Sequence, residues 1–273
     1  MKRLVCAAAL AAFALVSSAE TQFLQQSAAA GAQWRGRKVA FLGDSISAGV
    51  GTKKGYWKFV EETLGVEQHV YAVSGHRWSD MMARIADMQK ELGSDIDAIV
   101  VFIGTNDFGS GVPVGEWWTT NAIDTVFHGT PGKRIVRTPN VDVKTTRGAI
   151  NVTLRYLKEN WPDAQIILTT PVHRGIFAKS WRPKDQHQPD ELHSNMLGLF
   201  VDDYVRVNRE AADIWSCPLI DFFRDCGITP LVPSHGKYMN APDWDRLHPN
   251  ATGHQRMAAL ICSRLAALPV LRP

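Results

Sequence analysis

Short apolar runs alternate with amphipathic segments along most of the chain, a pattern typical of α/β proteins. Nearly continuous apolar runs predict five strands, at 38–42, 69–73, 98–103, 165–170 and 218–221. Helical spacing predicts helices at 56–64, 79–92, 147–161 and 194–214, and a last one capped by Asn250. Because strands apolar on both sides are covered on both faces, we expect a three-layer α/β/α sandwich around a central, mostly parallel five-stranded sheet.

Three stretches interrupt this alternation. Residues 108–146 are rich in Gly, Pro and Thr and contain Trp117-Trp118, while 171–193 and 222–244 also read as loops. We find no internal repeat and no linker, so we expect one domain at 37–273 with an insertion at about 108–146. Because that insertion follows the strand ending at 103, it should lie near any site at the strand ends.

The N-terminus has the pattern of a targeting segment. Lys2 and Arg3 precede an apolar run from Leu4 to Val16, and small residues follow as far as Ala19. This order predicts a secretory signal peptide at 1–19, and residues 20–36 read as a loose leader. The alternative is a buried N-terminal helix. No other apolar run is long enough to span a membrane, so we expect an exported protein, periplasmic or extracellular, without a stable membrane anchor.

The amino-acid composition narrows the class of protein further. Hydrophobic residues make up 45% and charged residues 21%, as in ordinary globular proteins rather than disordered or fibrous ones. The formal net charge is +3 and falls toward zero without the signal peptide. No basic face is evident, so we expect no nucleic-acid partner.

The cysteines leave two alternatives open. Cys217, Cys226 and Cys262 remain after the predicted cleavage. In an oxidising compartment Cys217 and Cys226 could form a disulfide, or all three could be buried small hydrophobic residues. No CxxC occurs and no His/Cys cluster has zinc spacing, so we expect no metal and no organic cofactor.

Chemically versatile residues follow three of the predicted strands. Asp44-Ser45, Gly75 and Asn106-Asp107 each come directly after one. Parallel strands end at the same edge of a sheet, so these groups should meet there, where ligands bind in such folds. Asp245 and His248 lie in a loop before the last helix, close enough for one turn to aim both at one point.

These groups, in this order, resemble the SGNH (GDSL-type) hydrolase family. The matching segments are Gly43-Asp44-Ser45, Ser74-Gly75-His76, Gly104-Thr105-Asn106-Asp107 and Asp245-Arg246-Leu247-His248. The resemblance spans nearly the whole predicted mature chain. It implies a flavodoxin-like fold and a serine ester hydrolase acting on small-molecule or polysaccharide esters.

The chemistry of ester hydrolysis suits these residue types. A serine hydroxyl needs a base, which His248 can be for Ser45, and Asp245 can orient the imidazole. By resemblance, the backbone N–H groups of Ser45 and Gly75 and the side-chain amide of Asn106 form the oxyanion hole.

Other residues near these motifs are weaker candidates. Asp44 is expected to hydrogen-bond the turn around Ser45, and Asp107 is expected to be structural. Trp117 and Trp118 could stack on sugar rings or pack within their loop. The candidates for substrate binding are Asp44, His76, Arg77, Trp117, Trp118 and Arg174.

The expected function is an exported carbohydrate esterase that removes acetyl or other short acyl groups through an acyl-serine intermediate. The alternative among enzymes is a lysophospholipase or thioesterase acting on lipid acyl groups. The alternative from another class is a secreted carbohydrate-binding protein without turnover.

Overall fold

A computed structural model describes residues 31–178, 188 and 190–272 of the chain. The predicted signal peptide and most of the leader lie outside the described residues. The end of the leader is not loose, contrary to our expectation. A 3₁₀ turn, η1 (Ala32–Trp34), buries Trp34, whose indole Nε1–H donates to the carbonyl of Leu265 at 2.6 Å.

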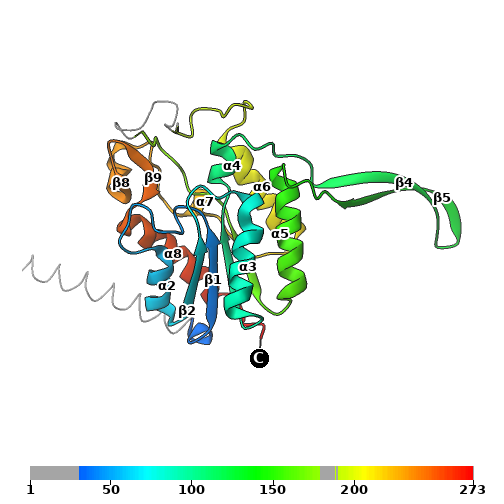
Figure 1. Ribbon diagram of the computed structural model, residues 1–273, viewed down its shortest axis with the longest axis horizontal. Coiled ribbons are helices and arrows are strands. Elements are labelled where there is room, and N and C mark those ends of the chain that lie inside the picture. Colours follow the sequence, from blue (N-terminus) through cyan, green and yellow to red (C-terminus); the bar gives the residue numbers. More distant parts are fainter. Residues whose placement is uncertain (1–30, 179–187, 189, 273) are drawn as a thin grey trace, which may run out of the picture.

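The centre of the molecule is a five-stranded sheet in which every neighbouring pair is parallel (Figure 1). Its strands in spatial order are β2 (Glu67–Ala72), β1 (Lys38–Gly43), β3 (Ala98–Phe102), β6 (Gln165–Thr169) and β7 (Leu219–Ile220). The sequence-based prediction of five strands is confirmed, and the sheet is entirely rather than mostly parallel. Gly43 of β1 lies in register with Ala72 and Phe102, so these three strands end at one level.

Helices cover both faces of the sheet, as Figure 1 shows, so the predicted three-layer fold is confirmed. The longer helices are α2 (Tyr56–Leu64), α3 (Met81–Leu92), α5 (Thr146–Asn160), α6 (Val201–Ile214) and α8 (Ala251–Ala266). Consecutive strand residues face opposite layers. Phe41 packs with residues of α2 and α8, whereas Leu42 packs with residues of α3, α5 and α6.

Several predicted boundaries were wrong for local reasons. The helix expected from 194 begins at Val201, because Asn195 Oδ1 accepts the backbone N–H groups of Leu197 and Leu199 and closes a turn first. The helix expected to be capped by Ser79 begins two residues later, after the 3₁₀ turn η2 (Trp78–Asp80). The cap predicted at Asn250 is confirmed, since its side chain accepts from Thr252 and Gly253.

The segment expected to be loop-like before the last helix contains short elements. They are α7 (Phe222–Asp225), η4 (Pro233–Tyr238) and two antiparallel strands, β8 (Met239–Ala241) and β9 (Asp245–Pro249). These strands carry Asp245 and His248, so this part of the chain is more ordered than its sequence suggested.

We had expected the insertion at about 108–146 to be irregular, but it contains two long strands. After α4 (Thr105–Gly109), strands β4 (Trp118–Phe127) and β5 (Thr130–Pro139) form a long antiparallel hairpin. Its turn has positive φ at His128 (48°) and Gly129 (78°), which suits the twist of a tight hairpin. The hairpin points away from β8 and β9 in Figure 1, whereas the first residues of the insertion belong to α4 together with Asn106. The expectation that the insertion lies near the site was therefore wrong for the hairpin.

The three cysteines of the domain are free and buried, so the disulfide alternative does not hold. Cys217 belongs to the apolar cluster on the α3, α5 and α6 side of the sheet. Cys226 and Cys262 belong to the cluster on the opposite side. The sheet therefore separates the two residues that a disulfide would have joined.

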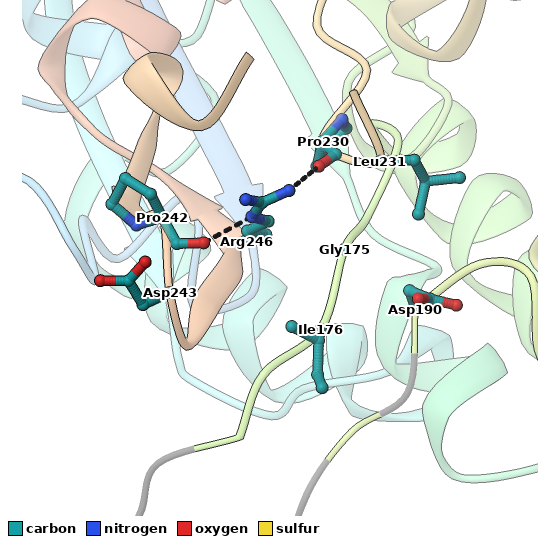
Figure 2. Close-up of a pocket in the computed structure, with 8 residues that line it drawn as sticks. All are labelled: Gly175, Ile176, Asp190, Pro230, Leu231, Pro242, Asp243 and Arg246. Atoms are coloured by element: carbon teal, nitrogen blue, oxygen red, sulfur yellow. Dashed lines mark hydrogen bonds between the residues drawn. The ribbon is translucent and has the colours of Figure 1, made fainter. Parts of the chain in front are cut away.

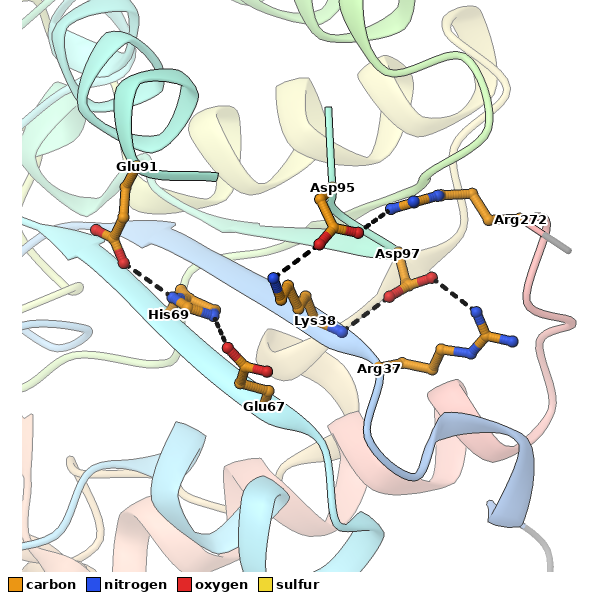
Figure 3. A network of polar contacts seen from close by, with 8 residues as sticks. All are labelled: Arg37, Lys38, Glu67, His69, Glu91, Asp95, Asp97 and Arg272. Carbon is orange, nitrogen blue, oxygen red and sulfur yellow. Dashed lines mark hydrogen bonds and ion pairs between the residues drawn. The ribbon is translucent and has the colours of Figure 1, made fainter. Parts of the chain in front are cut away.

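Ion pairs gather at the amino end of the sheet (Figure 3). Asp97 accepts the backbone N–H of Lys38 and pairs with Arg37, while Asp95 pairs with Lys38 and with Arg272 near the end of the chain. Most of these ion pairs are partly exposed to solvent, so each has modest energy, and the pair of Asp95 with Arg272 ties the C-terminal tail to the sheet. The candidate reactive residues lie at the other edge.

Candidate active site

Ser45 lies in a tight turn that begins directly after β1. The amide of Ala48 donates to the carbonyl of Asp44 at 2.8 Å, and the amide of Val50 donates to the carbonyl of Ser45 at 3.0 Å. Gly43 is required before this turn, since a Cβ there would approach the Ser47 hydroxyl to 2.1 Å. The turn holds the Ser45 hydroxyl at the carboxyl edge of the sheet.

The structure brings Ser45 together with His248 and Asp245, across some two hundred residues of chain. His248 Nε2 lies 3.0 Å from Ser45 Oγ, and His248 Nδ1 lies 3.0 Å and 3.1 Å from the two carboxylate oxygens of Asp245. All three side chains are buried. They form a continuous hydrogen-bonded row of carboxylate, imidazole and hydroxyl.

The charges in this row determine which atom carries each proton. Burial alone would raise the pKa of Asp245, but hydrogen bonds from His248 and Asn240 and the charge of the imidazole together hold that pKa below its usual value. Asp245 is therefore an anion that accepts a hydrogen bond from Nδ1–H of His248. The Nε2 lone pair of a neutral imidazole then faces the Ser45 hydroxyl and can accept its proton.

Asn240 of β8 holds the other side of this carboxylate, and sequence reasoning missed it. Its Nδ2 donates to Asp245 Oδ2 at 2.8 Å, while the backbone N–H of His248 donates to Oδ1 at 3.0 Å. Gly51 must be a glycine here, because a Cβ would lie 2.7 Å from Asn240 and 3.1 Å from His248. No local pattern marks Asn240, since only the pairing of β8 with β9 brings it to Asp245.

Phe177 limits the movement of the imidazole from another side. Its ring meets the His248 ring edge-on, with centroids 5.3 Å apart. The backbone of Phe177 also bridges to Asp245. The imidazole is thus held by a carboxylate and an aromatic ring that come from separate segments of the chain.

Gly75 and Asn106 lie beside each other at the same edge. Gly75 adopts a φ of +84°, which favours glycine, and Asn106 Nδ2 donates to the carbonyl of the adjacent His76 at 2.9 Å. Within the described part of the chain, the backbone N–H groups of Ser45 and Gly75 donate to no backbone carbonyl. These two N–H groups and the second hydrogen of the Asn106 amide are free to bind an oxygen of a ligand.

Asp44 is fully buried and faces no open pocket, so it does not fit the substrate-binding role for which it was a candidate. Its Oδ1 accepts the backbone N–H of Ile46 at 3.0 Å, as we expected for a residue that supports the turn. Burial raises the pKa of Asp44 to about 7, despite this hydrogen bond and the nearby charges of His248 and Arg174.

Arg174 is also fully buried rather than lining a pocket. Its Nη1 donates to the carbonyl and hydroxyl of Thr105 at 3.1 Å, and its Nη2 donates to Gln188 Oε1 at 2.8 Å. Arg174 therefore ties the start of α4 to Gln188, and it was wrong to expect it at the site's surface.

Of the two alternatives for Trp117 and Trp118, the structure shows packing within the protein rather than rings open to a sugar. Trp117 is only 8% exposed and donates from Nε1 to Glu210 at 2.7 Å. Both rings pack against the cluster formed by α3, α5 and α6, and Arg137 lies over the Trp118 ring. These contacts occupy ring surfaces that sugar stacking would need.

The residues that follow Gly75 differ in how close they lie to the site. The carbonyl of His76 meets Asn106, so His76 adjoins the site, while Arg77 pairs with Asp80 at 3.6 Å. Asp107 is buried and accepts the backbone N–H of Trp78 at 3.2 Å, in line with a structural role. Burial raises the pKa of Asp107 to about 7.

A buried polar group beneath the Ser45 turn was not foreseen. The hydroxyls of Ser47 and Tyr56 lie 2.6 Å apart, and the backbone N–H of Tyr56 donates to Nδ1 of His254 at 3.1 Å. Burial, followed by the charge that His248 carries when protonated, lowers the pKa of His254 to about 4. His254 is thus a neutral acceptor that anchors α2, not a second base.

A surface pocket of about 340 Å³ is lined by residues from several loops and by one residue of β9 (Figure 2). Its wall includes Arg246, which alternates with Asp245 along β9 and donates to the carbonyls of Pro230 and Pro242. Neither Ser45 nor His248 lines it. This pocket is therefore distinct from the row of reactive groups.

No metal-binding group of acidic, histidine or cysteine side chains occurs among the residues that the structure describes. In the same residues, no helix has the length and apolarity needed to cross a bilayer.

The fold and the site together define a class of protein: an α/β/α hydrolase whose serine motif follows the first strand and whose Asp-x-x-His motif precedes the last helix. The chain belongs to the GDSL-like lipase/acylhydrolase family, whose model matches residues 41–256. It is therefore a member of a family of GDSL-type carboxylic ester hydrolases, and the resemblance inferred from sequence is confirmed.

Solved structures support the same fold. One shares 26% identity with a TM-score of 0.66, and the match covers 87% of this chain and 99% of that chain. A possible lipase from Chitinophaga pinensis shares 18% identity with a TM-score of 0.60, over 83% and 96% of the chains. The acetyl xylan esterase AlAXEase shares 23% identity with a TM-score of 0.52, over 83% and 98%. No curated protein sequence matches the chain.

Proposed function

We propose that this protein hydrolyses carboxylic esters through an acyl-serine intermediate, with Ser45 as nucleophile, His248 as base and Asp245 as the group that orients the imidazole. The observation that carries the proposal is the hydrogen-bonded row from Asp245 through His248 to Ser45, with separations of 3.0 Å at both links. Membership of an ester hydrolase family supports the same reaction class.

In the acylation half-reaction, Ser45 Oγ bonds to the ester carbonyl carbon while its proton passes to His248 Nε2. The carbonyl oxygen becomes an oxyanion in the tetrahedral intermediate. The imidazolium then gives its proton to the departing alkoxide oxygen, and the ester C–O bond breaks to leave acyl-Ser45. Asp245 stabilises the imidazolium throughout this step without taking the proton.

In the deacylation half-reaction, water replaces the alcohol. His248 takes a proton from the water as its oxygen bonds to the acyl carbon. The imidazolium then returns that proton to Ser45 Oγ as the acyl bond breaks, which releases the carboxylic acid. The enzyme is restored without any cofactor in this scheme.

The oxyanion hole comprises the backbone N–H groups of Ser45 and Gly75 and the side-chain amide of Asn106. Two observations support this assignment. The N–H groups at the turn after β1 and in the loop after β2 are free, and the Asn106 amide is held beside that loop. Donors placed in advance stabilise the developing negative charge without reorganisation.

We propose that the substrates of this enzyme are acetylated carbohydrates outside the cytoplasm. The signal-peptide pattern at 1–19 supports export, and the fold is shared with an acetyl xylan esterase. The rival is hydrolysis of lipid acyl groups, since a possible lipase shares the fold as well. Trp117 and Trp118 of the insertion are not available to stack on sugar rings.

The test is acetate release from a panel of acetylated polysaccharides, with Ser45→Ala as the blank. We expect release by the wild type alone. A second assay compares acetyl and octanoyl p-nitrophenyl esters, and the proposal requires faster turnover of the acetyl ester. Preference for the octanoyl ester would support the lipid rival. Unchanged ester hydrolysis by Ser45→Ala would remove the catalytic assignment of Ser45. Absence of ester hydrolysis by the wild type would favour a non-catalytic carbohydrate-binding protein.

A further inference from the structure

The hairpin of β4 and β5, residues 118–139, forms an arm that leaves the body of the molecule (Figure 1). Within the described residues these two strands pair only with each other, so each has one edge without a neighbouring strand. A two-stranded hairpin standing alone is at best marginally stable in water. The arm therefore has the properties of an element that is completed by another strand.

The arm exposes large apolar side chains on both of its faces. Along β4, Ile123 and Phe127 share one face and are 43% and 61% exposed. The other face carries Val126 at 63% and, across the hairpin beside Ala122, Ile135 at 72%. Soluble monomers rarely leave such a group of apolar side chains uncovered.

The two edges of the arm differ in how well they are blocked. The β5 strand contains two prolines and three cations, namely Pro131, Pro139, Lys133, Arg134 and Arg137. Prolines and positive charges are the usual means of preventing an edge strand from pairing. By contrast, β4 has no proline and a single ionisable side chain, Asp124. The open edge is therefore that of β4.

We propose that β4 pairs antiparallel with β4 of a second copy of this chain, around a two-fold axis near Ile123. The product is a four-stranded antiparallel sheet in the order β5, β4, β4, β5. Such a contact is the same on both copies, so it satisfies both open edges at once and closes without forming a fibre.

The distribution of charge favours pairing of β4 with β4 over pairing of β5 with β5 or of β4 with β5. Pairing through β5 would bring the three cations of one copy against the three of the other. Pairing through β4 with the axis at Ile123 places Asp124 opposite Ala122 and Ile123 opposite its own copy, so no like charges meet. Pairing β4 of one copy with β5 of the next would leave an edge free at each end and extend without limit.

The first test is sedimentation velocity of the whole protein over a wide concentration range. We expect a dimer that dissociates on dilution. The variant Ile123→Lys would place two lysines against each other at the axis, so we expect its dimer dissociation constant to rise by about tenfold or more. The matched control is Ile135→Lys on β5, which should leave the dimer intact, and circular dichroism confirms that both variants fold.

The second test is disulfide trapping. Residues opposite each other in antiparallel strands have Cα atoms about 4.5–5.5 Å apart, within the range that a disulfide spans. Among Ala122→Cys, Ile123→Cys and Asp124→Cys, we expect the variant nearest the axis to form a covalent dimer, and Ile135→Cys to form none. The three native cysteines of the domain are buried and should not interfere.

A monomer at every concentration would overturn the proposal. So would open-ended polymers, or cross-linking through Ile135→Cys in preference to the β4 positions.

Discussion

Asn240 Nδ2 donates a 2.8 Å hydrogen bond to Oδ2 of Asp245, the carboxylate oxygen farther from His248 Nδ1. Antiparallel pairing of β8 with β9 brings the two residues together. The carboxylate is thereby fixed from both sides, and one fixed carboxylate positions the imidazole that faces Ser45.

Asn240→Ala should lower kcat about tenfold while KM stays near the wild-type value. The reason is that a lost hydrogen bond to a charged group costs about 1.5–3 kcal/mol, and the remaining carboxylate can rotate. Loss of this donor should also raise the pKa of Asp245, because one of the hydrogen bonds that hold that pKa down is removed. The matched control is Asn160→Ala at the exposed end of α5. A change in Tm without a change in kcat would reduce Asn240 to a structural residue.

Asn106→Ala should lower kcat by about 10²–10³-fold, equivalent to about 2.7–4 kcal/mol, because one donor to the oxyanion is lost. KM should change little, since the ground-state carbonyl needs that donor less than the oxyanion does. Loss of the bond to the His76 carbonyl should cost only about 1 kcal/mol of stability. Steady-state kinetics beside thermal unfolding separates the two effects. Retention of most of the wild-type kcat would remove Asn106 from the oxyanion hole.

The free energy of unfolding should fall as pH drops from about 6.5 to about 4, in part because of His254. Its pKa is about 4 when folded against 6.5 when free, so the unfolded state binds the extra proton in this window and gains in stability. A proton on Nδ1 of His254 would also break the hydrogen bond that this nitrogen accepts from the backbone N–H of Tyr56.

His254→Gln should flatten this dependence by up to about 3 kcal/mol, because glutamine does not titrate there. Urea unfolding at several pH values measures the difference. The control is His193→Gln, a residue with an exposed side chain. Equal slopes for wild type and His254→Gln would contradict the prediction.

Trp117→Phe should destabilise the protein by about 1–2 kcal/mol, because the hydrogen bond to Glu210 is lost from a buried position. The kinetics on acetylated polysaccharide should remain those of the wild type. A raised KM for the polysaccharide, with an unchanged KM for p-nitrophenyl acetate, would instead show that Trp117 contacts sugar.

Much of the fold was predictable because its determinants are local. The apolar runs at 38–42 and 98–103 are strands in the structure, and apolar spacing identified α2 and α5. The hairpin arm was missed, since it buries neither face and so lacks the alternation that marks a strand.

By itself, the sequence determined the order of the layers and the short motifs that place Ser45 and Asn106 after strand ends, because strand burial and turn chemistry are encoded by neighbouring residues. Only the tertiary structure decided that Arg174 and Trp117 are buried, that the sheet separates Cys217 from Cys226, and that Asn240 reaches Asp245. These outcomes depend on contacts between segments far apart in the chain, and local periodicity carries no information about which distant surfaces meet.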